Sequence, residues 1–517
     1  MKSNAILLTL LLFVIQTSAS AQNAVTTITD SRGDAVPAAD GEPGSTLTEE
    51  QILITFGGRQ EPQVPWKVSP AAEPKPAFRY EFWPRESALK PGSGLLYYFR
   101  AVTSVLQRDG CLKTIRDIAN RNVQTTAEDR AFIASIEPVF DDLQALAYCE
   151  DLSWDHRNRD IQGPKLYYFK LDDVQASRDL ARLLMIKARI QLADGDFDGV
   201  SKTVLIGNRL AYLVGQGESV IQRLVACAIT AMMRIIIEET IQTPGCPNLY
   251  WAIATIPLPV VSIRQSVELE LDAIHRAFPA LRQAQTADWS EETAMEHWVQ
   301  CLKELRALLG SAESEDSRQT ILAVDYSDFV EPARARLRAA GFTEERLEKM
   351  PEPSIVMADA AYELDRLAEG IRKDILLPGP QNNPLTLISL HAAELQETRR
   401  LSEELGKDVS WNSAADLFAV PLFPSIQQLA AAADRTPIML RRLMTLEAIR
   451  MYAAAHDGQL PNLLPELSPV PAVNAFSTEQ PFQFRVESGD DGQVATLSGN
   501  IPNFPAANRL RFRIVTE

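Results

Sequence analysis

Residues 440–458, LRRLMTLEAIRMYAAAHDG, contain the clearest helical pattern of the chain. Polar side chains such as Arg441 and Glu447 lie mostly opposite one apolar face. That face is formed by Leu440, Leu443, Met444, Ala448, Met451, Tyr452 and Ala455. Asp457-Gly458 ends the pattern, because glycine adopts the left-handed conformation that helix ends favour, and Pro461 prevents the helix from resuming. The stretch therefore predicts an amphipathic helix that packs on a core.

Helical periodicity also recurs through most of the preceding chain. It falls at about 95–106, 126–149, 174–194, 198–214, 218–242, 262–283, 288–309, 327–340, 354–374, 383–406 and 425–433. The polar, acidic stretch 310–325 is our best candidate for a boundary or a loop. We expect a mainly α fold of packed antiparallel helical hairpins, with solenoid-like stacking as one form, in two helical regions at 90–309 and 326–456.

A small β module is expected at 470–517, after the helices. Apolar residues alternate with polar ones at Phe482, Phe484 and Val486, and a turn at 489–492 leads into a second strand. In a third strand, Leu510, Phe512 and Ile514 share one face and Arg509, Arg511 and Arg513 share the other. The module is therefore predicted to be a small antiparallel sheet.

The first 21 residues have the pattern of a cleavable signal peptide. Lys2 precedes the apolar run 5–15, and Ala19-Ser20-Ala21 forms a small-residue cleavage site. An uncleaved membrane anchor is the alternative, but the run is shorter than the roughly 20 residues that a span requires. We expect a periplasmic or otherwise extracytoplasmic protein, with a disordered lead-in at 22–50 and an extended, proline-rich segment at 51–89.

The 517 residues carry a formal net charge of -17, which disfavours nucleic acid as a partner. The longest apolar helical run, 220–241, contains Arg223 and Arg234, and each would cost several kcal/mol in the middle of a bilayer. We therefore expect a buried core helix there, and no membrane span after signal cleavage.

Five cysteines are too few for a disulfide-built scaffold, and the odd number leaves at least one thiol unpaired. Cys227 and Cys301 lie in helical patterns, where a small buried hydrophobic side chain is the expected role. Cys111, Cys149 and Cys246 lack the flanking residues of a catalytic thiol, and the pairing of the five stays open.

Two stretches resemble known families. Residues 184–207 resemble a tetratricopeptide-type helical hairpin, with Ala188 at the close-packing position and Gly195-Asp196-Phe197 in the turn. Residues 188–200, 247–252 and 446–497 together resemble an uncharacterised family of exported proteins from planctomycete-type bacteria. That resemblance implies export but no activity, and Asn474-Ala475 replaces the Asp-Pro pair of the family pattern.

Candidate chemistry is sparse. His297 and Cys301 lie four residues apart on a predicted helix and could face one metal ion, with Glu292 or Glu296 nearby, but no third ligand stands at a readable spacing. No nucleophile elbow, phosphate loop or dinucleotide motif is present, so we assign no catalytic, cofactor-binding or metal residues and expect no cofactor.

We expect structural roles for the other charged and aromatic groups that could also serve function. The carboxylate pairs could serve glycoside chemistry, but in a chain with 68 acidic residues we expect solvated surface. These pairs are Asp141-Asp142, Asp172-Asp173 and Glu344-Glu345. The arginine stripe of the last strand could meet an anionic partner, although pairing with carboxylates is expected, and the aromatic residues of 78–99 are expected to seal the helices.

We expect a non-enzymatic interaction or scaffold role in the cell envelope, in which the helical body presents a surface to a protein or another envelope component. The alternative is an envelope hydrolase whose acidic residues are brought together only by the fold. A pocket that gathers two acids, or a histidine and an acid, within hydrogen-bond reach would favour the hydrolase.

Overall fold

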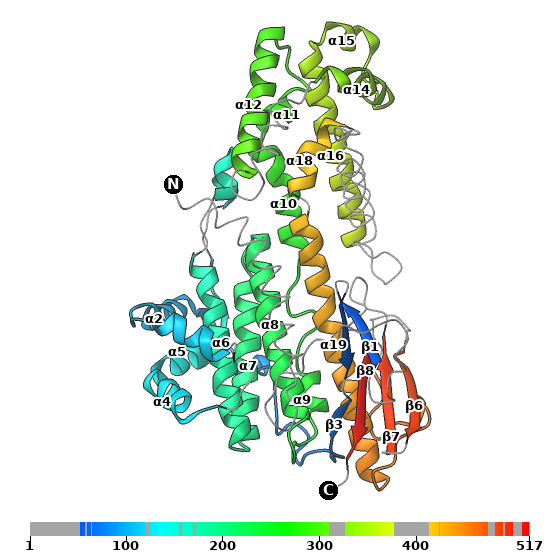
Figure 1. The fold of residues 1–517 in the computed structure, drawn as a ribbon. Helices are drawn as coiled ribbons and strands as arrows, with labels where there is room; N and C mark the ends of the chain where they lie inside the picture. Colours follow the sequence, from blue (N-terminus) through cyan, green and yellow to red (C-terminus); the bar gives the residue numbers. More distant parts are fainter. Residues whose placement is uncertain are drawn as a thin grey trace.

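A computed structural model of the chain describes residues 52–56, 59–63, 65–119, 121, 125–154, 158–168, 172–309, 326–376, 413–422, 424–473, 481–489, 492–499 and 509–515. The predicted signal peptide at 1–21, the lead-in at 22–50, the boundary at 310–325 and the helix at 383–406 lie outside these residues. The described residues form a mainly helical protein with a small sheet near the C-terminus, as the sequence predicted (Figure 1).

Helices supply most of the described structure. Those before residue 260 are α2 (Leu95–Leu106), α3 (Cys111–Ala119), α4 (Ala127–Ser135), α5 (Glu137–Ala147), α6 (Asp172–Ala193), α7 (Phe197–Gly215), α8 (Val220–Ile241) and α9 (Tyr250–Ala254). Those after it are α10 (Arg264–Ala277), α11 (Pro279–Gln283), α12 (Glu291–Leu309), α14 (Ser327–Ala339), α15 (Glu344–Lys349), α16 (Glu352–Leu376), α18 (Ala414–Leu422) and α19 (Pro424–Ala455). Short 3-10 turns include η3 (Pro164–Tyr168).

Prolines explain where helix boundaries differ from the sequence prediction. The single helix expected at 126–149 is two helices, because α5 starts anew at Glu137 with Pro138 in its first turn, and Pro279 likewise begins α11 after α10. Pro437 has the opposite outcome, because α19 continues through it as one helix of 32 residues. Thr436 and Ile438 on either side are buried, so packing outweighs the missing backbone hydrogen bond.

The C-terminal sheet has four strands in the order β3-β8-β7-β6. Strands β6 (Gln483–Gly489), β7 (Gly492–Ser498) and β8 (Arg509–Ile514) form the expected antiparallel module. The sequence did not predict β3 (Trp66–Val68), which pairs with β8 in parallel and joins the N-terminal segment to this sheet. Figure 1 shows the sheet beside α19.

Two further strand pairs hold the N-terminal segment. Strand β1 (Ile52–Phe56) pairs antiparallel with β2 (Arg59–Gln63) in a hairpin. Strand β4 (Lys90–Ser93) pairs in parallel with β5 (Cys149–Asp151), next to the start of α2.

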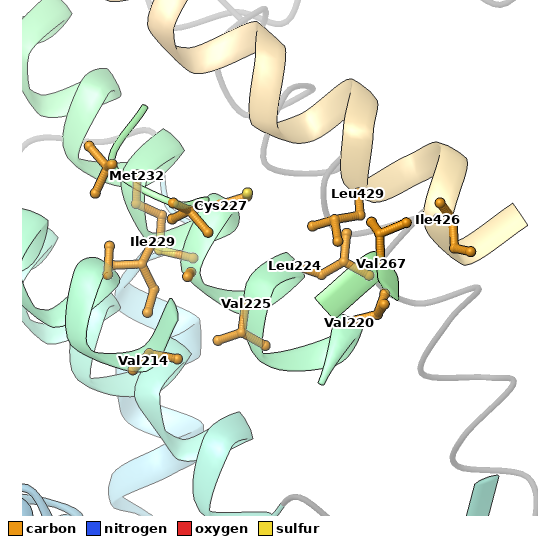
Figure 2. Packing of buried hydrophobic residues seen from close by; sticks show 14 of the residues in the cluster. Val214, Val220, Leu224, Val225, Cys227, Ile229, Met232, Val267, Ile426 and Leu429 are labelled. Carbon is orange, nitrogen blue, oxygen red and sulfur yellow. The ribbon is translucent and has the colours of Figure 1, made fainter. Parts of the chain in front are cut away.

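Helix α8 lies at the centre of the core and packs against α6, α7, α10 and α19. Its Val220, Leu224 and Val225 lie among Val214, Val267 and Leu429 of neighbouring helices (Figure 2). This helix is long and apolar enough to cross a membrane, but 78% of its most apolar window is buried within the protein. A core helix is therefore the interpretation that its packing supports.

Candidate functional site

The sequence-predicted pair His297 and Cys301 lies on α12 without further ligands. The Cys301 side chain is 2% exposed, and burial raises the pKa of its thiol to about 12, so it stays neutral. The His297 ring packs on Trp289 at a centroid distance of 4.3 Å. Over the described ranges, no group of three or more His, Cys, Asp or Glu could hold a metal ion. The helix thus carries Cys301 into the core.

Three members of the adjacent carboxylate pairs form ion pairs with basic side chains. Glu344 pairs with Arg338, and Glu345 pairs with Lys349 at 2.6 Å. Asp142 lies 3.3 Å from Arg100 of α2. The side chains of Asp172 and Asp173 lie outside the described residues. These contacts do not bring two acids together over a cleft, so they give the glycosidase interpretation no support.

The aromatic segment 78–99 is divided between core and surface. Tyr80 and Phe82 are buried, and the Trp83 ring meets Tyr212 edge-on at 5.4 Å. Phe99, by contrast, is 43% exposed. Most of these rings therefore seal the helices, as the sequence suggested, but α2 keeps apolar groups on its outer side.

A buried ion pair near the end of α19 joins three distant chain segments; we call it the clasp. The clasp comprises Glu447, Arg450, Asn248 and the backbone of 69–71 and 246–249. Both charged side chains are 0% exposed, and Arg450 Nη1 lies 2.7 Å from Glu447 Oε1. Arg450 also donates to the carbonyl oxygens of Ser69 and Cys246, at 2.8 and 2.9 Å.

The remaining groups of the clasp complete its hydrogen bonds. Glu447 Oε2 accepts from the Leu249 amide at 2.6 Å, and Asn248 Nδ2 donates to the Glu447 carbonyl at 2.8 Å. Burial raises the pKa of the neighbouring Cys246 thiol to about 12, despite the opposite effect of Arg450. Because each buried charge is occupied by protein groups, the clasp is a structural tie and not a reaction centre.

Among the described residues, one histidine lies within hydrogen-bond reach of an acid, and this contact joins α10 to α16. His275 Nε2 lies 2.9 Å from Asp365 Oδ1, and Arg282 of α11 lies 3.6 Å from the same oxygen. Burial raises the pKa of Asp365, but the hydrogen bond and charge of His275 and the charge of Arg282 outweigh it and lower the pKa overall. The sequence missed this pair because 90 residues separate its members.

This His–Asp pair lacks the third group of a nucleophilic triad. His275 Nδ1 is buried and has no hydrogen-bond partner within the described part of the chain. A nucleophile would have to stand at that nitrogen. Glu270, one turn earlier on α10, has a pKa raised to about 7 by burial, with a smaller opposing effect from Arg276. A small cavity lies between α8 and α19, and its lining includes Cys227, Thr230, Val261, Ala433 and Thr436. Asp365 and Glu270 are not among its lining residues.

Among the described helices, α2 exposes several large apolar side chains on one outer face. Leu96, Phe99 and Leu106 are 67%, 43% and 56% exposed, and their spacing places them on one side of the helix. The opposite side buries Tyr98, Ala101, Val102 and Val105 in the core. We call the exposed side, with Thr103 between Phe99 and Leu106, the α2 outer face.

Comparisons with known proteins find no family that matches the chain, no similar curated protein and no similar solved structure.

Proposed function

We propose that the protein is a non-enzymatic binding protein of the cell envelope, and that the α2 outer face rests on an anionic membrane surface. The observation that carries the proposal is the exposure of three large apolar side chains on a single helical face. Single exposed apolar residues are ordinary in soluble proteins, whereas an aligned group is typical of an interaction surface.

Local charge favours an anionic bilayer as the partner. Residues 90–113 contain four basic residues and one acidic residue, Asp109, in a chain whose net charge is -17. The basic residues, Lys90, Arg100, Arg108 and Lys113, are all exposed. A helix with an apolar face and basic neighbours lies in the interface of a membrane and is attracted to anionic headgroups. Each such charge contributes about 1 kcal/mol near an anionic surface.

The expected binding is peripheral and reversible. Full burial of a Leu or Phe side chain is worth about 1.5–3 kcal/mol, and insertion into the headgroup region removes only part of each side chain from water. A helix of 12 residues is about 18 Å long, which is short of the roughly 30 Å hydrocarbon core. The proposal therefore requires no membrane span, and it places the protein on the membrane side of an extracytoplasmic compartment.

Vesicle co-sedimentation tests the proposal. The chain from residue 22 should sediment with vesicles of phosphatidylglycerol and phosphatidylcholine, and much less with phosphatidylcholine alone or in high salt. The double variant Leu96→Glu/Phe99→Glu should lose this binding. Leu463→Glu is the matched control, since Leu463 is 62% exposed but isolated in the loop after α19, and it should bind normally. Failure of the unaltered chain to sediment, or equal binding by the double variant, would refute the proposal.

The hydrolase alternative stays a prediction. Its requirement for a histidine beside an acid is met only by His275 and Asp365 among the residues that the structure describes, and the histidine side chain is 5% exposed. A pair of a buried histidine and a partly exposed carboxylate, with no described nucleophile beside it, ties two helices together, as its position between α10 and α16 indicates.

A further inference from the structure

The C-terminal sheet has one apolar and one basic face. Leu510, Phe512, Ala495 and Leu497 lie in the hydrophobic core, on the face that also carries Trp66. Residues between them in the strands point to the opposite face, because side chains alternate along a strand. That opposite face, the basic sheet face, carries Lys67, Arg485, Arg509, Arg511 and Arg513 together with Thr496, Ser498 and Glu487.

The basic sheet face carries five basic residues and, among its described residues, one acid, Glu487. Two of the five, Arg509 and Arg513, already interact with other groups of the chain. The pairing register places Arg511 opposite Thr496, and Thr496 opposite Arg485. Adjacent strands lie about 4.8 Å apart, so these three residues form a row across the sheet with a hydroxyl group between two guanidinium groups.

Arg511 is the residue that distinguishes this face from an ordinary charged surface. It is 3% exposed, and its Nε and Nη1 are buried with no hydrogen-bond partner among the described residues. The sequence had suggested that this arginine pairs with a carboxylate of the chain, and no described carboxylate contacts it. A buried charge without a counterion is costly, and guanidinium groups bind oxyanions through paired N–H donors.

We propose that the basic sheet face binds a phosphate group, held by Arg511 and Arg485 with the Thr496 hydroxyl group between them. A phosphate has enough oxygen acceptors and charge for two guanidinium groups, whereas a carboxylate has two oxygens and one charge. The group could come from free phosphate or from a phosphodiester in a headgroup or polymer. This site uses none of the residues of the α2 outer face.

Thermal unfolding and calorimetry test the site on the chain from residue 22. Inorganic phosphate should raise the melting temperature relative to sodium acetate at equal ionic strength, because ligand binding to the native state stabilises it. Glycerophosphodiester is the second probe: binding of both probes identifies a phosphodiester source, and binding of phosphate alone identifies the free ion. An equal effect of acetate, or no effect of phosphate, would overturn the proposal.

Substitutions locate the site. Arg485→Gln should weaken phosphate binding by about tenfold, the value of one charged hydrogen bond, and Arg511→Met should abolish it. Arg511→Met should fold at least as well as the unaltered chain, because it removes a buried unpaired charge. Arg372→Gln, at an exposed arginine of α16, is the matched control and should bind normally. Unchanged binding by Arg511→Met would refute the site, and Leu96→Glu/Phe99→Glu should bind phosphate fully even if the α2 proposal fails.

Discussion

Arg450→Met is the sharpest test of how this fold is held together. The substitution keeps much of the side-chain volume but removes the guanidinium group from the clasp. Four contacts disappear with it: the ion pair with Glu447, the hydrogen bonds to the carbonyl oxygens of Ser69 and Cys246, and the 4.0 Å contact with Cys246 Sγ. The contacts with Ser69 and Cys246 link α19 to segments that are far away in the sequence, so the loss is not confined to one turn of α19.

The expected loss of stability is large because Glu447 remains buried. Its carboxylate is 0% exposed and keeps one short hydrogen bond, from the Leu249 amide at 2.6 Å. Removing one partner of a buried ion pair typically lowers the free energy of unfolding by about 3–5 kcal/mol. The double variant Glu447→Gln/Arg450→Met should recover part of this loss, because no unpaired charge is left in the core.

Urea denaturation followed by tryptophan fluorescence measures the effect. The matched control is Arg338→Met, whose partner Glu344 belongs to a pair with side chains 52% and 58% exposed, and it should change the free energy of unfolding by about 0–1 kcal/mol. If Arg450→Met behaved like Arg338→Met, the clasp would contribute no more than a surface pair, and the argument from its burial would be wrong.

Three further predictions concern packing, thiols and pH. Gly207→Ala should destabilise the protein by about 1–3 kcal/mol, because the new methyl group would clash with Met233 Sδ of α8. Gly370→Ala lies in open space on α16 and should stabilise the protein by up to about 1 kcal/mol. The urea midpoints of the two variants measure the difference. Iodoacetamide should leave all five buried thiols unmodified in the native protein and label all five in urea, and rapid labelling of the native chain would contradict their burial. Burial raises the pKa of Asp129, but hydrogen bonds from Thr126 and the charge of Arg121 outweigh it and lower the pKa below its usual value of 3.8. The free energy of unfolding should therefore fall as the pH drops from the usual pKa of an aspartate to the lowered pKa of the native protein. Asp129→Asn should flatten this acidic part of the pH profile of the urea midpoint, and an unchanged profile would count against the capping box.

Local patterns in the sequence predicted the helices well, because each helix carries its own periodicity and end signals. The helix expected at 198–214 is α7, Phe197–Gly215, and Gly458 ends α19 with the positive φ of 82° that a C-terminal glycine supplies. Prolines gave the main errors at boundaries. Pro279 starts a new helix while Pro437 lies inside one, and only tertiary packing distinguishes the two situations.

Contacts between distant segments were out of reach of the sequence. A strand of three residues, Trp66–Val68, has no pattern of its own, and its partner β8 begins at residue 509. His275 and Asp365 are likewise ordinary helical residues until α10 and α16 pack together. The basic stripe of β8 was visible in the sequence, but the burial of Arg511 and the approach of Arg485 depend on strand register.

The contacts between distant segments determine the order in which parts of the chain fold. Residues 66–71 are fixed by β8 and by Arg450, a partner 381 residues beyond Ser69. Such contacts form only after their loop-closure entropy has been overcome and both ends of the chain are present, so this part of the fold assembles late. A chain that folds late stays unfolded while its N-terminus is already available, which suits export led by the predicted signal at 1–21. If the predicted signal leads export, we expect the clasp and the mixed sheet to close after translocation, with β4 paired to β5 next to the start of α2.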